Sequence, residues 1–230
     1  MIGAGTQLGN RYDENYDHLL AEENLLVVVD GMGSGDGSRF AGRTTMEVMA
    51  GLRTGAPDAD RLRALVAEAH RAVSQWGRPG LAGCTMAALR VDGERAWIAS
   101  IGDSRVYRWR TGQLEQLTVD HTEAWLGAVN GWWPHDSPRA RAARYHLLRY
   151  VGHPDAPEPD VANVTLHPGD VYLLCTDGIA DDVSYHRIAD VLGSSTSAPQ
   201  MARSLLGAAL DAGGNDNATV AVLQVSVGAA

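Results

Sequence analysis

Residues 25–33 read Leu25-Leu26-Val27-Val28-Val29-Asp30-Gly31-Met32-Gly33. Five apolar residues in a row, three of them β-branched, are typical of a buried β-strand. The run continues into a carboxylate and then into glycines, which turn sharply because they lack a Cβ atom. Asp-Gly alone is typical of an ordinary turn. At the mouth of a buried strand, however, Asp30 is held by a rigid element and still reaches solvent, which suits a hard metal ion.

The same pattern recurs twice further along the chain. Residues 171–178 form a second apolar run that ends in Asp177-Gly178, and Asp216 stands just before a third run, Ala218 to Val225. Three acidic residues at strand ends, far apart in the sequence, can converge on one edge of a sheet. Mg²⁺ and Mn²⁺ prefer carboxylate, carbonyl and water oxygens as ligands. The pattern therefore points to a two-metal hydrolytic site.

Composition indicates one globular domain over residues 1–230. The net charge of −9 argues against a nucleic-acid partner. Cys84 and Cys175 lie in apolar, strand-like runs, so we expect reduced core thiols rather than a disulfide. The chain shows neither a signal peptide nor a long apolar stretch, and we expect a cytoplasmic protein with no membrane partner.

The periodicity predicts strand clusters between pairs of helices. Residues 1–24 are expected to be polar and rich in turns before the Asp30 strand. Hairpins are expected for residues 84–91 with 95–100 and for 104–110 with 113–118. The predicted helices are one that carries Phe40, Thr44, Val48 and Leu52, then those over residues 57–76, 120–129, 138–149, 182–192 and 199–210. Because strict βαβ alternation is absent, this order favours an α/β sandwich with mainly antiparallel sheets.

Six short motifs stand in a fixed order between residues 29 and 219. They are Val29-Asp30-Gly31-Met32-Gly33, Gly83-Cys84-Thr85, Ile101-Gly102-Asp103-Ser104-Arg105-Val106-Tyr107, Leu117-Thr118-Val119-Asp120-His121-Thr122, Cys175-Thr176-Asp177-Gly178-Ile179 and Asp216-Asn217-Ala218-Thr219. Each is weak alone, but as an ordered series they resemble the metal-dependent Ser/Thr protein phosphatases of the PP2C (PPM) family. The resemblance runs through nearly the whole chain.

The resemblance implies an α+β fold, a four-layer α-β-β-α sandwich in which helices flank two mainly antiparallel central sheets. It also implies two Mn²⁺ or Mg²⁺ ions at one end. Asp30 would bridge both ions, the Gly31 carbonyl would bind one of them, and Asp177 and Asp216 would complete the other. A hydroxide shared by the two ions would then attack phosphorus in line.

Asp103 could join a third metal site, as the corresponding aspartate of the family can, or it could be an ordinary turn residue between two strands. Asp120 and His121 are expected to stabilise the loop or a helix start rather than to touch substrate.

Arg11 resembles the family arginine that binds the substrate phosphate, because a planar guanidinium suits that role. Its spacing to the next motif is one residue longer than usual, so a solvated surface arginine is the alternative. Asp17 matches a carboxylate that supports the metal ligands from behind, whereas Tyr16 replaces the usual Glu or Gln. Met32 stands where some relatives carry a histidine proposed as general acid, which leaves the proton donor unassigned.

Residues 130–159 correspond to the variable flap of the family. Trp132 and Trp133, next to the arginine-rich segment 138–149, could shape substrate choice, or they could be aromatic packing beside a solvated basic face.

We therefore expect a phosphatase that acts on phosphoserine or phosphothreonine in proteins and opposes a bacterial Ser/Thr kinase. The alternatives are a catalytically silent binding module with the same fold and a hydrolase of small phosphoesters.

Overall fold

Two five-stranded antiparallel sheets form the centre of the computed structural model, which describes residues 1–134 and 137–226. The first sheet has the strand order β1 (Ile2–Gln7), β10 (Ala218–Gln224), β9 (Val171–Cys175), β6 (Arg105–Arg110) and β7 (Gln113–Gln116). The second has the order β2 (His18–Glu22), β3 (Leu25–Gly31), β4 (Cys84–Asp92), β5 (Arg95–Ile101) and β8 (Asp160–Thr165). Neighbouring strands pair antiparallel throughout both sheets.

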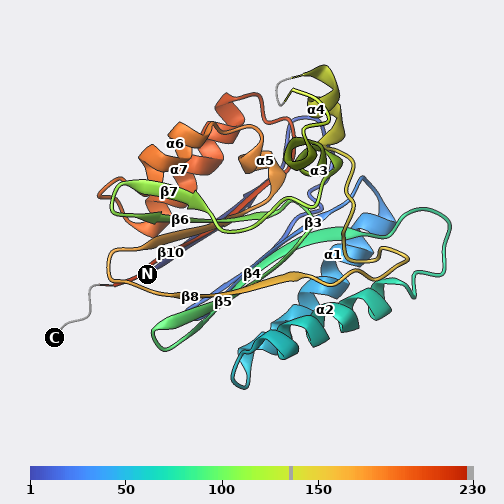
Figure 1. Ribbon diagram of the computed structural model, residues 1–230, viewed down its shortest axis with the longest axis horizontal. Helices are drawn as coiled ribbons and strands as arrows, with labels where there is room; N and C mark the ends of the chain where they lie inside the picture. The colour runs from blue at the N-terminus through green and yellow to red at the C-terminus, as the bar shows by residue number, and fades with distance from the viewer. Residues whose placement is uncertain (135–136, 227–230) are drawn as a thin grey trace.

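Helices cover the outer faces of both sheets (Figure 1). The second sheet carries α1 (Asp36–Met49), the 3₁₀ helix η1 (Ala50–Arg53) and α2 (Ala59–Val73). The first sheet carries α5 (Asp177–Ala180), α6 (Tyr185–Leu192) and α7 (Ala198–Asp211). The short helices α3 (Glu123–Asn130) and α4 (Pro138–Ala143) lie together at one end. The α+β sandwich of four layers is confirmed.

Strand β3 shows why an unbroken apolar run belongs in this fold. Leu25, Val27 and Val29 pack against α1 and α2, while Leu26 and Val28 face the first sheet. Both faces of the strand are therefore buried, so no position alternates to a polar residue. The same two-sided burial holds for β9, whose five residues are all buried.

The two predicted hairpins are confirmed as β4–β5 and β6–β7, but two other segments differ from expectation. Residues 1–24 contain strands β1 and β2, which were not predicted. The predicted helix over residues 138–149 ends at Ala143. The chain beyond it is needed for bridges to the core, because Leu147 pairs with Thr122 and Val151 with Cys84.

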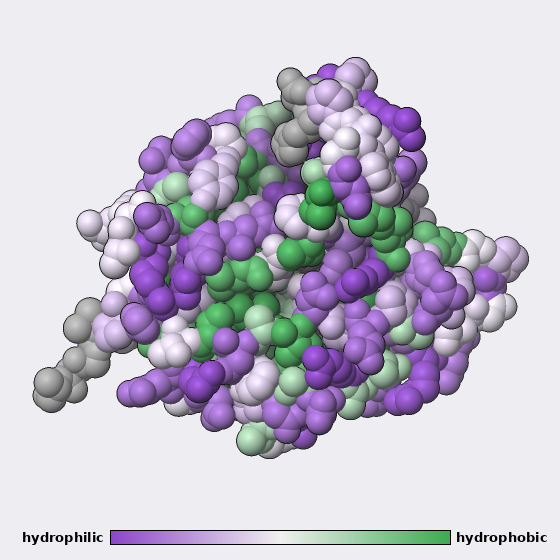
Figure 2. Space-filling model, in the orientation of Figure 1, coloured by the Kyte–Doolittle hydropathy of each residue, from purple (hydrophilic) through white to green (hydrophobic). Residues whose placement is uncertain are grey.

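The sandwich opens along the edge where β7 and β8 face each other. Apolar side chains gather over this region in the space-filling view (Figure 2). A groove of about 740 Å³ lies there, with Ile98, Leu117 and Val161 in its wall. Among the described residues, no helix has the length and apolar character needed to cross a membrane.

Candidate metal centre

Four aspartates line one cavity of about 190 Å³ at an end of the sandwich. Asp30 ends the core strand β3, and Asp177 follows β9 at the start of α5. Asp216 stands just before β10, and Asp103 lies in the turn between β5 and β6. The antiparallel pairing brings these ends together, because Asp30 lies opposite Thr85 and Cys175 lies opposite Val220. The structure thus brings together the carboxylates that the sequence separates.

Glycines next to two of these aspartates allow other backbone segments to come close. A Cβ atom on Gly31 would lie 2.9 Å from the carbonyl oxygen of Ser38, and one on Gly178 would lie 2.0 Å from the carbonyl oxygen of Asn217. Real side chains do not fit at such distances. Gly31 also lines the cavity, whereas Gly178 lets the start of α5 pack directly on the segment that carries Asp216. The Asp-Gly pairs therefore serve close packing at the site.

Burial and mutual repulsion raise the pKa values of these acids. Burial is the largest cause for Asp30 and Asp177, and the charges of neighbouring aspartates raise their pKa values further. Both pKa values therefore lie well above the ordinary 3.8. The pKa of Asp103 rises to about 7, first through burial and then through the charges of Asp120 and Asp181. A cation bound among these acids would stabilise them, because its charge offsets their mutual repulsion.

The donor set fits a hard divalent cation. Oδ1 of Asp177 is buried and has no hydrogen-bond partner among the described residues. Within that part of the chain, no three His, Cys, Asp or Glu side chains form a ready-made ligand set. The fit therefore rests on the shared cavity, the oxygen without a partner and the oxygen chemistry that Mg²⁺ and Mn²⁺ prefer.

Asp17 is buried and does not itself line the cavity. Its Oδ2 accepts a hydrogen bond from Thr176 Oγ1 at 2.9 Å, and the same hydroxyl accepts from the backbone N–H of Thr219 at 3.0 Å. Burial, the larger cause, and the charge of Asp216 raise the pKa of Asp17 to about 6. This network ties the residue before Asp177 to strand β10.

Arg11 is exposed and does not line the cavity, although its charge acts on Asp216. The neighbouring Tyr12 does line it, and its hydroxyl donates to Asp216 Oδ2 at 3.5 Å. Tyr12 was not predicted, because a tyrosine in a polar turn gives no signal of its own. Asp181, which acts on Asp103, was also missed although it follows the Asp177-Gly178 motif by only a few residues.

The expected flap is described over residues 130–134 and 137–159, and residues 135 and 136 lie outside the described residues. Its residues at the cavity of the four aspartates are Tyr145 and Leu147 rather than Trp132 and Trp133. Trp133 packs under Arg139, whose guanidinium carbon lies 4.5 Å from the ring centroid.

Comparisons with known proteins agree with this arrangement. The family model described as Protein phosphatase 2C matches residues 12–211. The serine/threonine protein phosphatase PstP of Mycobacterium tuberculosis is 32% identical over 222 residues, which cover 92% of this chain but only 42% of PstP. The protein phosphatase PhpP of Streptococcus pneumoniae is 26% identical over 236 residues, which cover 96% of each protein.

Structural similarity extends over almost the same length. The catalytic domain of PstP, solved in complex with two manganese ions, superimposes with a TM-score of 0.84 at 30% identity, and the match covers 98% of both chains. The strand order, the acidic cavity and the extent of both similarities lead to one conclusion: this chain belongs to the protein phosphatase 2C family.

Proposed function

We propose that this chain is a metal-dependent phosphatase that hydrolyses phosphoserine and phosphothreonine in proteins. The observation that carries the proposal is the convergence of Asp30, Asp103, Asp177 and Asp216 on one cavity. The names of PstP and PhpP, both protein phosphatases, support the same activity. We further propose that residues 1–230 act as a single phosphatase domain.

The cavity would hold two Mn²⁺ or Mg²⁺ ions. Asp30, the carbonyl of Gly31, Asp177 and Asp216 would hold them, while Asp103 would be available for a third ion. Support comes from the manganese complex of the PstP catalytic domain and from the buried oxygen of Asp177. When bound, such ions make hydroxide available near neutral pH and offset the charge of the phosphoryl group.

The residues of the chain itself position the reactants. The hydroxyl of Tyr12 lies beside the carboxylate of Asp216 and donates to its Oδ2 at the long distance of 3.5 Å. Asp17 holds Thr176 and, through the backbone, the start of α5. Arg11 would bind the substrate phosphate from the rim, because its exposed guanidinium can form two parallel hydrogen bonds with phosphate oxygens. The thioether of Met32 lines the cavity but donates no proton, so the leaving alkoxide would take its proton from water.

The proposed substrates are phosphorylated proteins, including those of a Ser/Thr kinase that this phosphatase would oppose. Both thiols, Cys84 and Cys175, are free and buried, which is consistent with the cytoplasm as the site of action.

Phosphate release from a phosphothreonine peptide tests this function directly. The metal-stripped chain is assayed with and without added Mn²⁺, beside Asp177→Asn and the control Asp190→Asn, whose residue is exposed on α6. We expect activity only with Mn²⁺, its loss in Asp177→Asn and its retention in Asp190→Asn. A parallel assay with a small aryl phosphate separates a protein phosphatase from a hydrolase of small phosphoesters.

A folded wild-type chain that releases no phosphate from either substrate would overturn the proposal. That result would favour the binding module, for which the exposed Trp132 on the flap would be the first surface to test.

A further inference from the structure

His121 is buried outside the metal cavity and is hydrogen-bonded to the turn that carries one of its acids. The backbone N–H of Gly102 donates to His121 Nδ1 at 3.1 Å, and the backbone N–H of His121 donates back to the Gly102 carbonyl at 2.9 Å. The backbone N–H of Leu148 in turn donates to the His121 carbonyl at 2.7 Å. His121 therefore holds Gly102, the residue directly before Asp103, through two hydrogen bonds.

These contacts indicate which ring nitrogen of His121 carries the proton. Because Nδ1 accepts a backbone N–H, it carries no proton, and the neutral ring has its proton on Nε2. Nε2 faces Asp160 Oδ2 at 3.2 Å, so it donates to that carboxylate. Arg149 Nη1 lies 3.4 Å from the same nitrogen and 2.9 Å from Asp160 Oδ1. Since both nitrogens are donors, Asp160 is the acceptor that the two side chains share.

Gly102 cannot be replaced by a residue with a side chain. Its φ of +98° is a conformation that side-chain-bearing residues rarely adopt, and a Cβ atom there would lie 2.4 Å from Cβ of Thr85. Thr85 itself lines the metal cavity and shares a hydrogen bond of 2.7 Å with Ser104. The turn is thus packed against the cavity wall on one side and held by His121 on the other.

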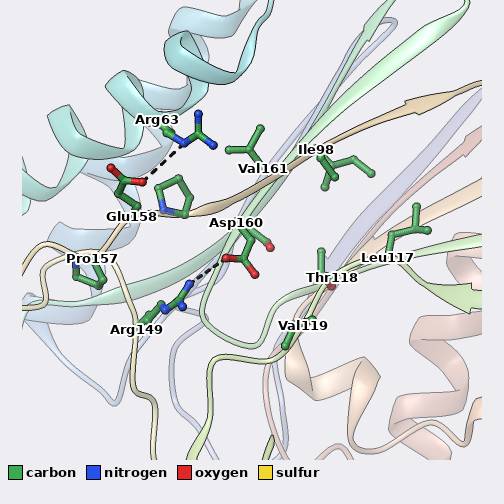
Figure 3. A pocket seen from close by; sticks show the side chains of 13 residues that line it. Arg63, Ile98, Leu117, Thr118, Val119, Arg149, Pro157, Glu158, Asp160 and Val161 are labelled. Carbon is green, nitrogen blue, oxygen red and sulfur yellow. Dashed lines mark hydrogen bonds and ion pairs between the residues drawn. The ribbon is translucent and has the colours of Figure 1, made fainter. Parts of the chain in front are cut away.

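Asp160 and Arg149, by contrast, belong to the wall of the groove beside β8. Figure 3 shows them paired there, next to a second pair formed by Arg63 and Glu158. The side chain of Asp160 is 49% exposed, so it can be replaced without opening the core. A surface carboxylate is therefore joined to the Asp103 turn through one imidazole ring.

We propose that His121 is a positioning residue of the metal cavity: it sets the direction of the Gly102–Asp103 turn, and Asp160 orients its ring from the groove. Groups that lie behind the ligands of a metal site orient those ligands, and mutation of such a group typically lowers metal affinity or activity by about 10- to 100-fold. The proposal rests on the proposed metal-binding function of the cavity.

The test is calorimetric titration of the metal-stripped chain with Mn²⁺, in parallel with the Mn²⁺ concentration that gives half-maximal phosphatase activity. His121→Phe removes both side-chain hydrogen bonds of the ring. His121→Asn keeps an amide oxygen close to the position of Nδ1. Asp160→Ala removes the orienting carboxylate at the surface, and Glu158→Ala, in the same groove wall, is the matched control because it does not contact His121.

We expect Mn²⁺ affinity to fall about 10-fold or more in His121→Phe and several-fold in Asp160→Ala, in line with the known effect of such supports. His121→Asn should bind Mn²⁺ more tightly than His121→Phe but no more tightly than Asp160→Ala, because it keeps the acceptor for Gly102 and lacks the contact with Asp160, and Glu158→Ala should bind like the wild type. The KM for the phosphopeptide at saturating Mn²⁺ should stay unchanged, because His121 does not face the substrate.

Two outcomes would overturn the inference in different ways. If the wild-type chain binds no Mn²⁺, the proposed function and this inference fail together. If the wild type binds Mn²⁺ and both His121→Phe and Asp160→Ala bind it equally well, only the role of His121 fails. Because Asp160 is at the surface, its variant gives a result even if His121→Phe does not fold.

Discussion

The acids of the cavity should make the metal-free protein less stable than it would be without them. Asp103→Asn tests this, because the pKa of Asp103 is raised from 3.8 to about 7, first by burial and then by Asp120 and Asp181. An acid with a raised pKa destabilises the fold once it ionises. The penalty is absent below pH 3.8, grows as pH rises towards about 7, and is complete above it.

The size of this penalty follows from the interval between the two pKa values. At about 1.4 kcal/mol for each pKa unit, the change from 3.8 to about 7 corresponds to about 4 kcal/mol. Neighbouring acids can take up a proton instead of Asp103, so we expect a gain of about 2 to 4 kcal/mol in Asp103→Asn at pH 8. For a chain of this length, that gain raises the Tm by about 5 to 15 °C.

Thermal unfolding in the presence of a chelator measures this effect at pH 4 and at pH 8. Asp103→Asn should melt well above the wild type at pH 8 and close to it at pH 4, whereas the exposed control Asp190→Asn should follow the wild type at both. Mn²⁺ should raise the wild-type Tm, because bound cations cancel the repulsion. If Asp103→Asn melts at or below the wild-type Tm at pH 8, the electrostatic reasoning is wrong.

Three further predictions concern residues other than Asp103. Burial lowers the pKa of His70 in the folded chain, so the unfolded chain takes up a proton at a higher pH than the folded chain does, and the Tm should drop as pH falls below about 6.5. His70→Gln should lessen that drop. A Tm that depends on pH in the same way in the variant and the wild type would contradict this. Asp170→Ala removes a buried carboxylate that accepts hydrogen bonds from Arg110, the His167 N–H and Tyr172, and should cost about 1 to 3 kcal/mol in denaturant unfolding; a loss below about 0.5 kcal/mol would refute its role. Gly178→Ala places a Cβ atom 2.0 Å from the Asn217 carbonyl oxygen, so it should lower the Tm and weaken Mn²⁺ binding in calorimetry, and wild-type values for both would contradict the packing argument.

Much of the acidic site could be predicted from the sequence because each acid adjoins a local pattern. Asp30 and Asp177 follow runs that are apolar at every position, and Asp216 precedes another. Such runs are buried on both faces, so their ends coincide with the ends of the sheets. The resemblance to a family then placed Asp103 and Asp17 in the same region, and the structure puts both there.

Strand β1 could not be predicted because the contact that explains its glycines is with a segment far away in the sequence. Gly3 and Gly5 weaken the local strand pattern, yet a Cβ atom on Gly3 would lie 2.1 Å from the backbone of Ala198 at the start of α7. The glycines allow a helix nearly two hundred residues later to pack directly on the strand. Propensity read along the chain contains no sign of that contact.

The fully buried row of α1 could not be predicted for a similar reason. Phe40, Thr44 and Val48 have helical spacing, but the fully buried row includes Thr45. The hydroxyl of Thr45 is hydrogen-bonded to the sulfur of Cys84 at 3.1 Å, which satisfies a polar group inside the core. From the sequence alone, such a polar residue would be expected at the surface, because its hydrogen-bond partner lies on another element.

The most direct measurement of the central claim is anomalous X-ray diffraction from crystals of this chain grown with Mn²⁺. We predict two strong manganese peaks inside the cavity, within coordination distance of Asp30, with Asp177 and Asp216 beside one of them, and loss of that peak in Asp177→Asn. A well-ordered cavity without manganese, or manganese bound only elsewhere on the surface, would contradict the account.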